Sequence, residues 1–194
     1  MGVLFMIDQL EDWSADAAHP LSGRLDLSHI GMSGHSYGAV TTQAMMGQQF
    51  PLNRNFRDER IDAVALFSPS ISKMESPEAS FGKIDMPVLA MTGTKDGSPI
   101  DPTQSPESRQ ELYQAMPVGD KYHLVFEGGE HHAFGSSPGR GKNRMDHHHP
   151  SIQELTLKFW DAYLKGDEEA LGWLQSEQPR EDCKLVEKDV WEWK

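Results

Sequence analysis

Four short runs of apolar residues, each bounded by turn-forming residues, lie along the middle of the chain. They cover residues 30–32, 63–67, 88–91 and 122–126. Continuous apolar runs of this length are typical of strands buried on both faces, as in a parallel sheet. Helix-forming segments at residues 39–49 and 106–116 lie between these runs. The alternation predicts an α/β fold in which a parallel sheet is flanked by helices.

Helical patterns also occur towards both ends of the chain. An N-terminal helix is predicted from apolar residues that share one helix face, namely Val3, Leu4, Ile7 and Leu10. Further along, Ser151 and Glu154 have the spacing of a capping box, and Gly166 is suited to end the helix that they start. These elements predict one domain over residues 1–178, followed by a charged, irregular tail over residues 179–194.

The charge balance limits the kinds of partner. The 194 residues include 18 Lys and Arg against 30 Asp and Glu, which gives a formal net charge of −12. Nucleic acids and anionic membranes bind clustered positive charge, so neither is an expected partner. No apolar run approaches the roughly 18 residues of a membrane span, and no signal peptide is recognisable, which leaves the compartment undecided. The single cysteine, Cys183, excludes an internal disulfide and is expected to be a free surface thiol.

The most informative motif is Gly34-His35-Ser36-Tyr37-Gly38, a G-x-S-x-G sequence. A predicted buried strand precedes it and a predicted helix follows it, which is the setting of a nucleophile elbow. Such a turn is tight, so its glycines are expected for steric reasons, and the serine Oγ is exposed at the carboxyl end of the sheet. The N–H of Tyr37 is then placed as one oxyanion donor. The alternative is a glycine-rich turn with an incidental serine.

Partners for this serine follow two later strands. A serine hydroxyl needs a base to become a good nucleophile, and the base needs an orienting acid. Asp96 follows the third predicted strand, and His131 and His132 follow the fourth. Each is a weak signal alone, since an Asp-Gly after a strand is usually only a turn. Their order along the chain predicts a triad of Ser36, Asp96 and one of these histidines, with no cofactor and no metal.

The chain resembles the dienelactone hydrolase and platelet-activating-factor acetylhydrolase-like branch of the α/β-hydrolase family. The resemblance lies in GRLDLSHIGMSGHSYGAVTTQ, MTGTKDGSPI, DKYHLVFEGGEHHAFG and KFWDAYLKGD, which together span most of residues 22–166. It implies an esterase that cleaves carboxylic esters of short acyl groups through an acyl-enzyme, with Ser36 as nucleophile and Asp96 as acid. It favours His131 as the base, because in this branch a Phe follows three residues later. His132 fits the shorter His-Ala-Phe form.

The same resemblance implies several strands ahead of the nucleophile strand, and this sequence predicts none there. The chain is therefore expected to be N-terminally incomplete, with the strand at residues 30–32 on an open sheet edge. The loop that supplies the second oxyanion donor would be missing, and loss of one such donor costs ~10²–10³ in rate. An open edge can also pair with a second copy or another chain. The alternative hypothesis is an inactive fragment or pseudo-hydrolase that binds a partner through this edge.

A histidine run, His147-His148-His149, precedes the predicted C-terminal helix. Such a run can bind zinc adventitiously, so a metal-binding module is a third hypothesis. Adjacent histidines on an extended segment point to opposite sides, which makes a site from the run alone geometrically poor. The favoured interpretation is a solvated loop ahead of a helix that begins near Pro150.

Overall fold

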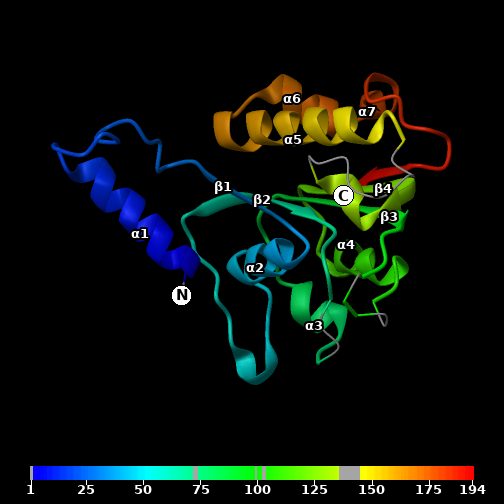
Figure 1. Cartoon of the computed structure of the whole chain (residues 1–194), viewed down its shortest axis with the longest axis horizontal. Coiled ribbons are helices and arrows are strands. Elements are labelled where there is room, and N and C mark those ends of the chain that lie inside the picture. The colour runs from blue at the N-terminus through cyan, green and yellow to red at the C-terminus, as the bar shows by residue number, and fades with distance from the viewer. Residues whose placement is uncertain (1, 72–73, 99, 102–103, 136–144) are drawn as a thin grey trace.

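The computed structural model describes residues 2–71, 74–98, 100–101, 104–135 and 145–194. Its centre is a five-stranded sheet in the order β1-β2-β3-β4-β5 (Figure 1). The strands are β1 (Ile30–His35), β2 (Ile61–Phe67), β3 (Val88–Lys95), β4 (Lys121–Glu130) and β5 (Val190–Trp193). The first four are parallel, and β5 pairs with β4 in the antiparallel direction. The expected α/β fold with a mostly parallel sheet is confirmed.

All four predicted strands are present. The inner strands are buried on both faces, which explains why their apolar runs can be recognised in the sequence. Val64, Ala65 and Leu66 of β2 and Leu89 of β3 have no exposed surface. Strands covered on both faces need apolar residues at every position, not at alternate ones. β1 instead alternates between exposed and half-buried residues, because it is the outer strand of the described sheet.

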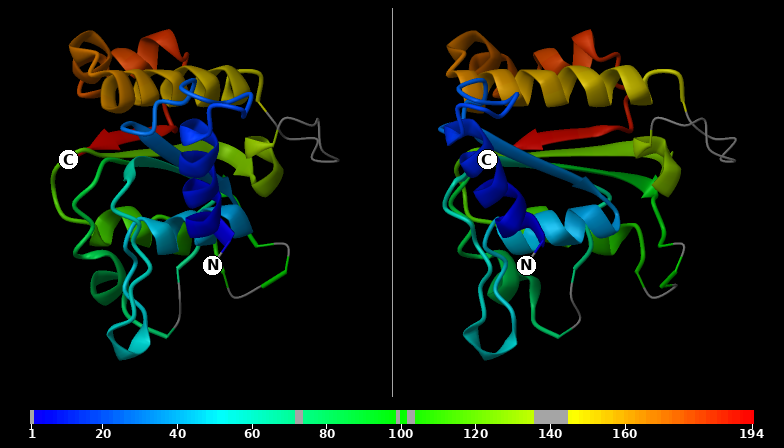
Figure 2. Two further views of the ribbon diagram at one scale, coloured as in Figure 1. Left: turned by 90° about the vertical axis from the view of Figure 1, so that its left-hand side faces the viewer. Right: turned by 60° about the vertical axis from the view of Figure 1, so that its left-hand side comes forward.

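Helices cover both faces of the sheet (Figures 1 and 2). One face carries α5 (His148–Lys165), α6 (Glu168–Leu174) and α7 (Gln178–Asp182), and the other carries α2 (Tyr37–Met45), α3 (Pro77–Phe81) and α4 (Glu111–Ala115). The predicted N-terminal helix is present as α1 (Gly2–Ala15), which lies beyond the β1 edge and buries only Ile7. Within the described ranges, every helix is too short or too polar to cross a bilayer.

The expectation of an irregular tail after residue 178 is wrong. That segment contains α7 and β5, and β5 completes the sheet beside β4. Trp191 is 4% exposed and packs in the core beneath α5. The backbone N–H and C=O of Lys121 both bond to Lys194. Residues 179–194 therefore belong to the same sheet as the rest of the chain, and the alternating tryptophans are the inward-facing positions of a strand.

Two further expectations near the C-terminus are corrected. α5 begins at His148, so Ser151 lies inside the helix and is not its N-cap. The Ser151 hydroxyl lies 2.6 Å from the carbonyl oxygen of His147 and 2.9 Å from that of Cys183. Gly166 does end this helix, with φ 69° in the left-handed region. Cys183 is 5% exposed, so it is a buried thiol and not a surface one.

Burial makes Cys183 chemically inert in the folded protein. Removal from solvent, together with the nearby Glu154 and Asp182, raises the pKa of its thiol to about 12. Since the thiolate is the reactive form, we expect iodoacetamide at pH 8 to label native protein at least about 100-fold more slowly than protein in guanidinium chloride. Intact-mass spectrometry over time measures both rates. Equal rates in the two conditions would contradict the burial of this side chain.

Candidate active site

The turn between β1 and α2 holds Ser36 in an uncommon backbone conformation. Its φ is 57° and its ψ is −117°, a region that non-glycine residues rarely adopt. The Ser36 N–H bonds to the carbonyl oxygen of Phe67 on β2, 2.9 Å away, which fixes the turn to the sheet. Strain of this kind is often found at functional sites. The strand–turn–helix arrangement expected around the motif is present.

The two glycines of the motif differ in whether the surrounding atoms leave space for a side chain. A Cβ added to Gly34 would lie 2.2 Å from the carbonyl carbon and oxygen of Gly38, whereas a Cβ on Gly38 would meet nothing within 4 Å. The steric explanation thus holds for Gly34, where the end of β1 passes directly beneath the start of α2. At Gly38 the turn has room for a side chain.

This difference predicts opposite outcomes for a matched pair of variants. Gly34→Ala must push the turn out of place, and a displacement of about 1 Å at a reacting group costs on the order of 100-fold in rate. Gly38→Ala is expected to keep activity within about threefold. The activity of both variants on p-nitrophenyl acetate, with circular dichroism to check folding, measures the effect. Equal activities would show that the Gly34 contact does not set the position of Ser36.

Three side chains from distant parts of the sequence meet at the carboxyl ends of the strands. Nε2 of His131 lies 2.9 Å from the Oγ of Ser36, and Nδ1 of His131 lies 2.8 Å from Oδ1 of Asp96. Ser36 follows β1, Asp96 follows β3, and His131 begins the 3-10 turn His131–Phe134 that follows β4. Asp96 has no exposed surface and His131 is 8% exposed. The arrangement can pass a proton from the hydroxyl to the imidazole, while the carboxylate holds the other ring nitrogen.

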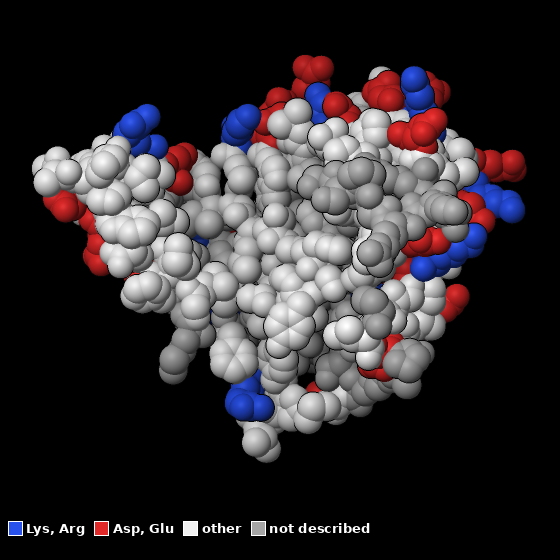
Figure 3. All heavy atoms as spheres, in the orientation of Figure 1, with Lys and Arg blue, Asp and Glu red and all other residues white. Residues whose placement is uncertain are grey.

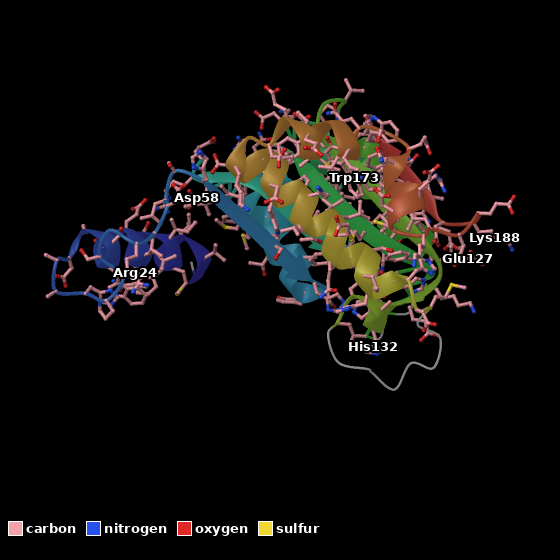
Figure 4. All side chains as sticks on the ribbon, turned by 90° about the horizontal axis from the view of Figure 1, so that it is seen from above. Arg24, Asp58, Glu127, His132, Trp173 and Lys188 are labelled. Atoms are coloured by element: carbon pink, nitrogen blue, oxygen red, sulfur yellow. The ribbon has the colours of Figure 1, made fainter. Side chains whose placement is uncertain are left out.

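The second candidate base, His132, does not reach Ser36. Its side chain is exposed, and its ring centre lies 5.9 Å from that of His131, at a steep angle. Successive residues of the 3-10 turn point in different directions, so only one of the two histidines can enter the site. Figure 4 shows His132 at the outer rim of the same face. Of the two expected alternatives, the structure brings His131 to the serine.

A buried arginine supports the carboxylate. Nε of Arg109 donates to the carbonyl oxygen of Asp96 at 2.6 Å and lies 3.3 Å from its Oδ1. Nη1 of Arg109 donates to the carbonyl oxygens of Ser68 and Pro69, each at 2.8 Å. On the other side, the hydroxyl of Thr92 donates to Oδ2 of Asp96 at 2.9 Å. Arg109 therefore ties the loop after β3 to the loop after β2.

The sequence gives no signal for this role of Arg109. The residue lies in the short turn Glu107–Arg109, where an isolated arginine is normally a solvated surface residue. In the structure it is 2% exposed. Burial lowers the pKa of its guanidinium, and the neighbouring Asp96 opposes that shift. The partners that satisfy it come from segments 13 to 41 residues away along the chain.

His35 holds the backbone of the candidate base. Its Nε2–H donates to the carbonyl oxygen of His131 at 3.0 Å, and the two rings lie 4.8 Å apart between centres. Burial, and then the proximity of His131, lowers the pKa of His35. A neutral ring beside the base avoids competition between two positive charges when His131 accepts a proton. The contact therefore gives His35 a structural role beside the site.

A small cleft opens beside Ser36, with a volume of about 210 Å³. It is lined by Ser36, Tyr37, Val40, Ser70, Ser98, Ile100, Asp101, Gln104 and Arg109. The side chains of Tyr37 and Ile100 are 79% and 85% exposed, so they form apolar walls at the mouth. The N–H of Tyr37 is at the first residue of α2, where the positive end of the helix dipole favours negative charge. Figure 3 shows few charged side chains at the centre of this face.

The histidine run is not a solvated loop. His148 and His149 form the first turn of α5, and His148 has no exposed surface. The His147 side chain is 11% exposed, and its Nε2 lies 2.8 Å from Oδ2 of Asp189. The expectation was wrong because the helix starts ahead of Pro150, which occupies its third position and needs no backbone donor there. Among the described residues, His147, His148 and Asp189 form the one group of three or more possible metal ligands whose ligand atoms all lie within 4.8 Å of one another.

No protein-family model matches the chain, and no curated protein matches it. The functional conclusion therefore rests on the geometry of the residues described above.

Proposed function

We propose that the protein is a serine hydrolase of the α/β-hydrolase type that cleaves carboxylic esters of short acyl groups. The observation that carries the proposal is the continuous pair of contacts, 2.9 Å and 2.8 Å, from Ser36 through His131 to Asp96. The order of the three residues along the chain, each after a parallel strand, agrees with the fold that the resemblance implies.

The proposed reaction has two halves that share one proton carrier. The Ser36 Oγ attacks the ester carbonyl carbon while Nε2 of His131 takes the hydroxyl proton. The tetrahedral oxyanion accepts a hydrogen bond from the N–H of Tyr37, and the alcohol leaves with the proton returned by Nε2. Water then gives a proton to Nε2 and attacks the acyl-enzyme, which releases the acid and restores Ser36. Asp96 keeps the proton of the neutral ring on Nδ1 throughout.

The size and lining of the cleft indicate the class of acyl group. A volume of about 210 Å³ holds a short acyl chain but not a fatty acyl chain. Each methylene that finds apolar contact adds about 0.8 kcal/mol of binding, and each one left in water adds none. Together with the short acyl group that the resemblance implies, this size limit leads us to expect that acetyl and propionyl esters are preferred.

A burst experiment tests the proposal. The wild-type protein should release one p-nitrophenolate per chain from p-nitrophenyl acetate in a fast phase, followed by slower turnover, because the acyl-enzyme accumulates. Across acetate, butyrate and octanoate, kcat/KM should not rise towards octanoate, because methylenes that extend beyond the cleft gain no apolar contact. Absence of both burst and turnover would contradict the proposal, and a preference for octanoate would contradict the assignment of the acyl class.

A second candidate function is a binding module that uses the free edge of β1. Within the described sheet, β1 is paired on one side only, and alternate residues along it are exposed. An edge strand of this kind can accept a strand from a second copy or from another chain. Sedimentation velocity distinguishes the candidates: the binding module predicts a dimer or complex with no turnover, and the hydrolase predicts turnover by the monomer.

A further inference from the structure

A second cluster of reactive side chains lies where α5 begins. Ring nitrogens of His147 and His148 and a carboxylate oxygen of Asp189 all lie within 4.8 Å of one another. The side chain of Asp189 has no exposed surface and that of His147 is 11% exposed. None of the three takes part in the proposed hydrolysis, so the cluster needs a separate explanation.

We propose that these three residues bind a divalent transition-metal ion, with zinc as the best match. Two imidazoles and one carboxylate form a ligand set that zinc accepts readily, with an open fourth position. Metal–ligand bonds of about 2.1 Å place tetrahedral ligand atoms about 3.4 Å apart. The longest separation allowed here is 4.8 Å, so side-chain adjustments that bring the ligand atoms up to about 1.4 Å closer complete the site.

The carboxylate of Asp189 is already held in place. Its Oδ1 accepts the backbone N–H of Glu127 at 2.7 Å, and its Oδ2 accepts that of Val186 at 2.8 Å. Nη1 of Arg180 donates to its backbone carbonyl at 3.1 Å. Hydrogen bonds of this kind orient a metal ligand before the ion arrives. Figure 4 shows Glu127 at the end of β4, so the cluster joins that strand to the segment ahead of β5.

The two histidines are also restrained by packing. The ring of His148 lies 4.3 Å from that of Phe126 and 4.7 Å from that of His147, measured between centres. Both histidines belong to the start of a well-formed helix, so their Cα positions are fixed. Side chains restrained in this way lose less conformational entropy on binding than free side chains do.

An acidic cleft reaches the cluster at His147. Its volume is about 610 Å³, and it is lined by Asp146, His147, Pro150, Glu154, Asp182, Cys183 and Lys184. Of the lining residues that carry a charge at neutral pH, three are acidic and one, Lys184, is basic. A concave surface with this balance raises the local concentration of cations.

The competing explanation is a simple ion pair. The 2.8 Å contact between His147 and Asp189 joins the start of α5 to the segment ahead of β5 without any metal. A metal ion would make the same connection stronger and add His148 to it. The two explanations differ in whether the protein takes up one ion per chain and becomes more stable when it does.

Zinc titration of the untagged, full-length protein tests the proposal. After treatment with EDTA and its removal, calorimetric titration with zinc chloride should show one ion per chain with a Kd at or below about 1 μM. At a free zinc concentration of 100 times this Kd, the Tm of the protein should rise by roughly 5–10 °C. Substitution with Co²⁺ should give the visible absorption bands of a tetrahedral site. The absence of saturable zinc binding would overturn the proposal.

Variants separate this site from adventitious binding by the histidine run. His147→Ala and Asp189→Asn should weaken zinc binding at least about 100-fold, whereas His149→Ala, the next residue of the same run but outside the cluster, should retain it. An equal loss in His149→Ala and His147→Ala would show adventitious binding by the run only. If the two cluster variants fail to fold, the wild-type stoichiometry, the Co²⁺ spectrum and the His149→Ala titration still decide the question.

Discussion

Replacing Ser36 with alanine is expected to lower kcat/KM for p-nitrophenyl acetate by at least about 10⁴-fold and to remove the burst. The substitution deletes the only atom that the proposed reaction uses as a nucleophile, so no acyl-enzyme can form. Removal of a triad serine leaves only the residual acceleration from the oxyanion donor and from substrate binding. The fold should be little affected, because the hydrogen bond that the structure describes for the Ser36 hydroxyl is the one to the candidate base, His131.

A neighbouring serine provides the control. Ser33 lies on β1 three residues earlier and is exposed, so Ser33→Ala should keep activity within about twofold. Measurements on both variants, prepared in parallel, also guard against a contaminating esterase. Residual activity in Ser36→Ala equal to that of the wild type would show that this serine is not the nucleophile.

The second large effect is expected at Arg109. In Arg109→Met the side chain has a similar length but no donors, so the carbonyl oxygens of Ser68, Pro69 and Asp96 lose their partner inside the protein. Breaking a buried charged interaction of this kind costs about 3–5 kcal/mol of unfolding free energy. A loss of that size lowers the Tm by roughly 10 °C in a chain of this length. Displacement of Asp96 should also reduce kcat/KM on the order of 100-fold.

Arg54→Met is the matched control for this effect. The Arg54 side chain is exposed, and its Nε donates a long hydrogen bond of 3.4 Å to the carbonyl oxygen of Pro51. Surface substitutions of this kind change the free energy of unfolding by about 0.5 kcal/mol or less, so the Tm should change by no more than about 2 °C. Thermal unfolding followed by circular dichroism measures both variants. Equal changes in the two variants would contradict the structural role given to Arg109.

The sequence predicts the central strands well because burial on both faces leaves a simple pattern. A strand such as β2 can be recognised from its own residues, without knowledge of its neighbours. β5 could not be recognised in this way. Trp191 and Trp193 alternate with other residues in a charged segment, and this alternation indicates a strand only once its pairing with β4 is known. Strand pairing over a separation of some 70 residues leaves no local trace.

The same distinction applies to the candidate site. Ser36, Asp96 and His131 could be proposed from sequence because each follows a recognisable strand, and the turn after a strand has a defined place in a parallel sheet. The resemblance favours His131 over His132, whereas the residues alone leave the choice open, since it depends on how the turn after β4 is wound. Arg109 and the pairing of His147 with Asp189 depend on contacts between distant segments, which no local pattern encodes.

The most direct test of the central claim is covalent labelling with a fluorophosphonate probe. Such a probe reacts with a serine whose hydroxyl is activated by a base and leaves other serines unmodified. Intact-mass spectrometry should show one adduct per chain, peptide mapping should locate it on Ser36, and His131→Ala should abolish it. The absence of an adduct on the folded wild-type protein, or an adduct on another residue, would contradict the claim that His131 activates Ser36.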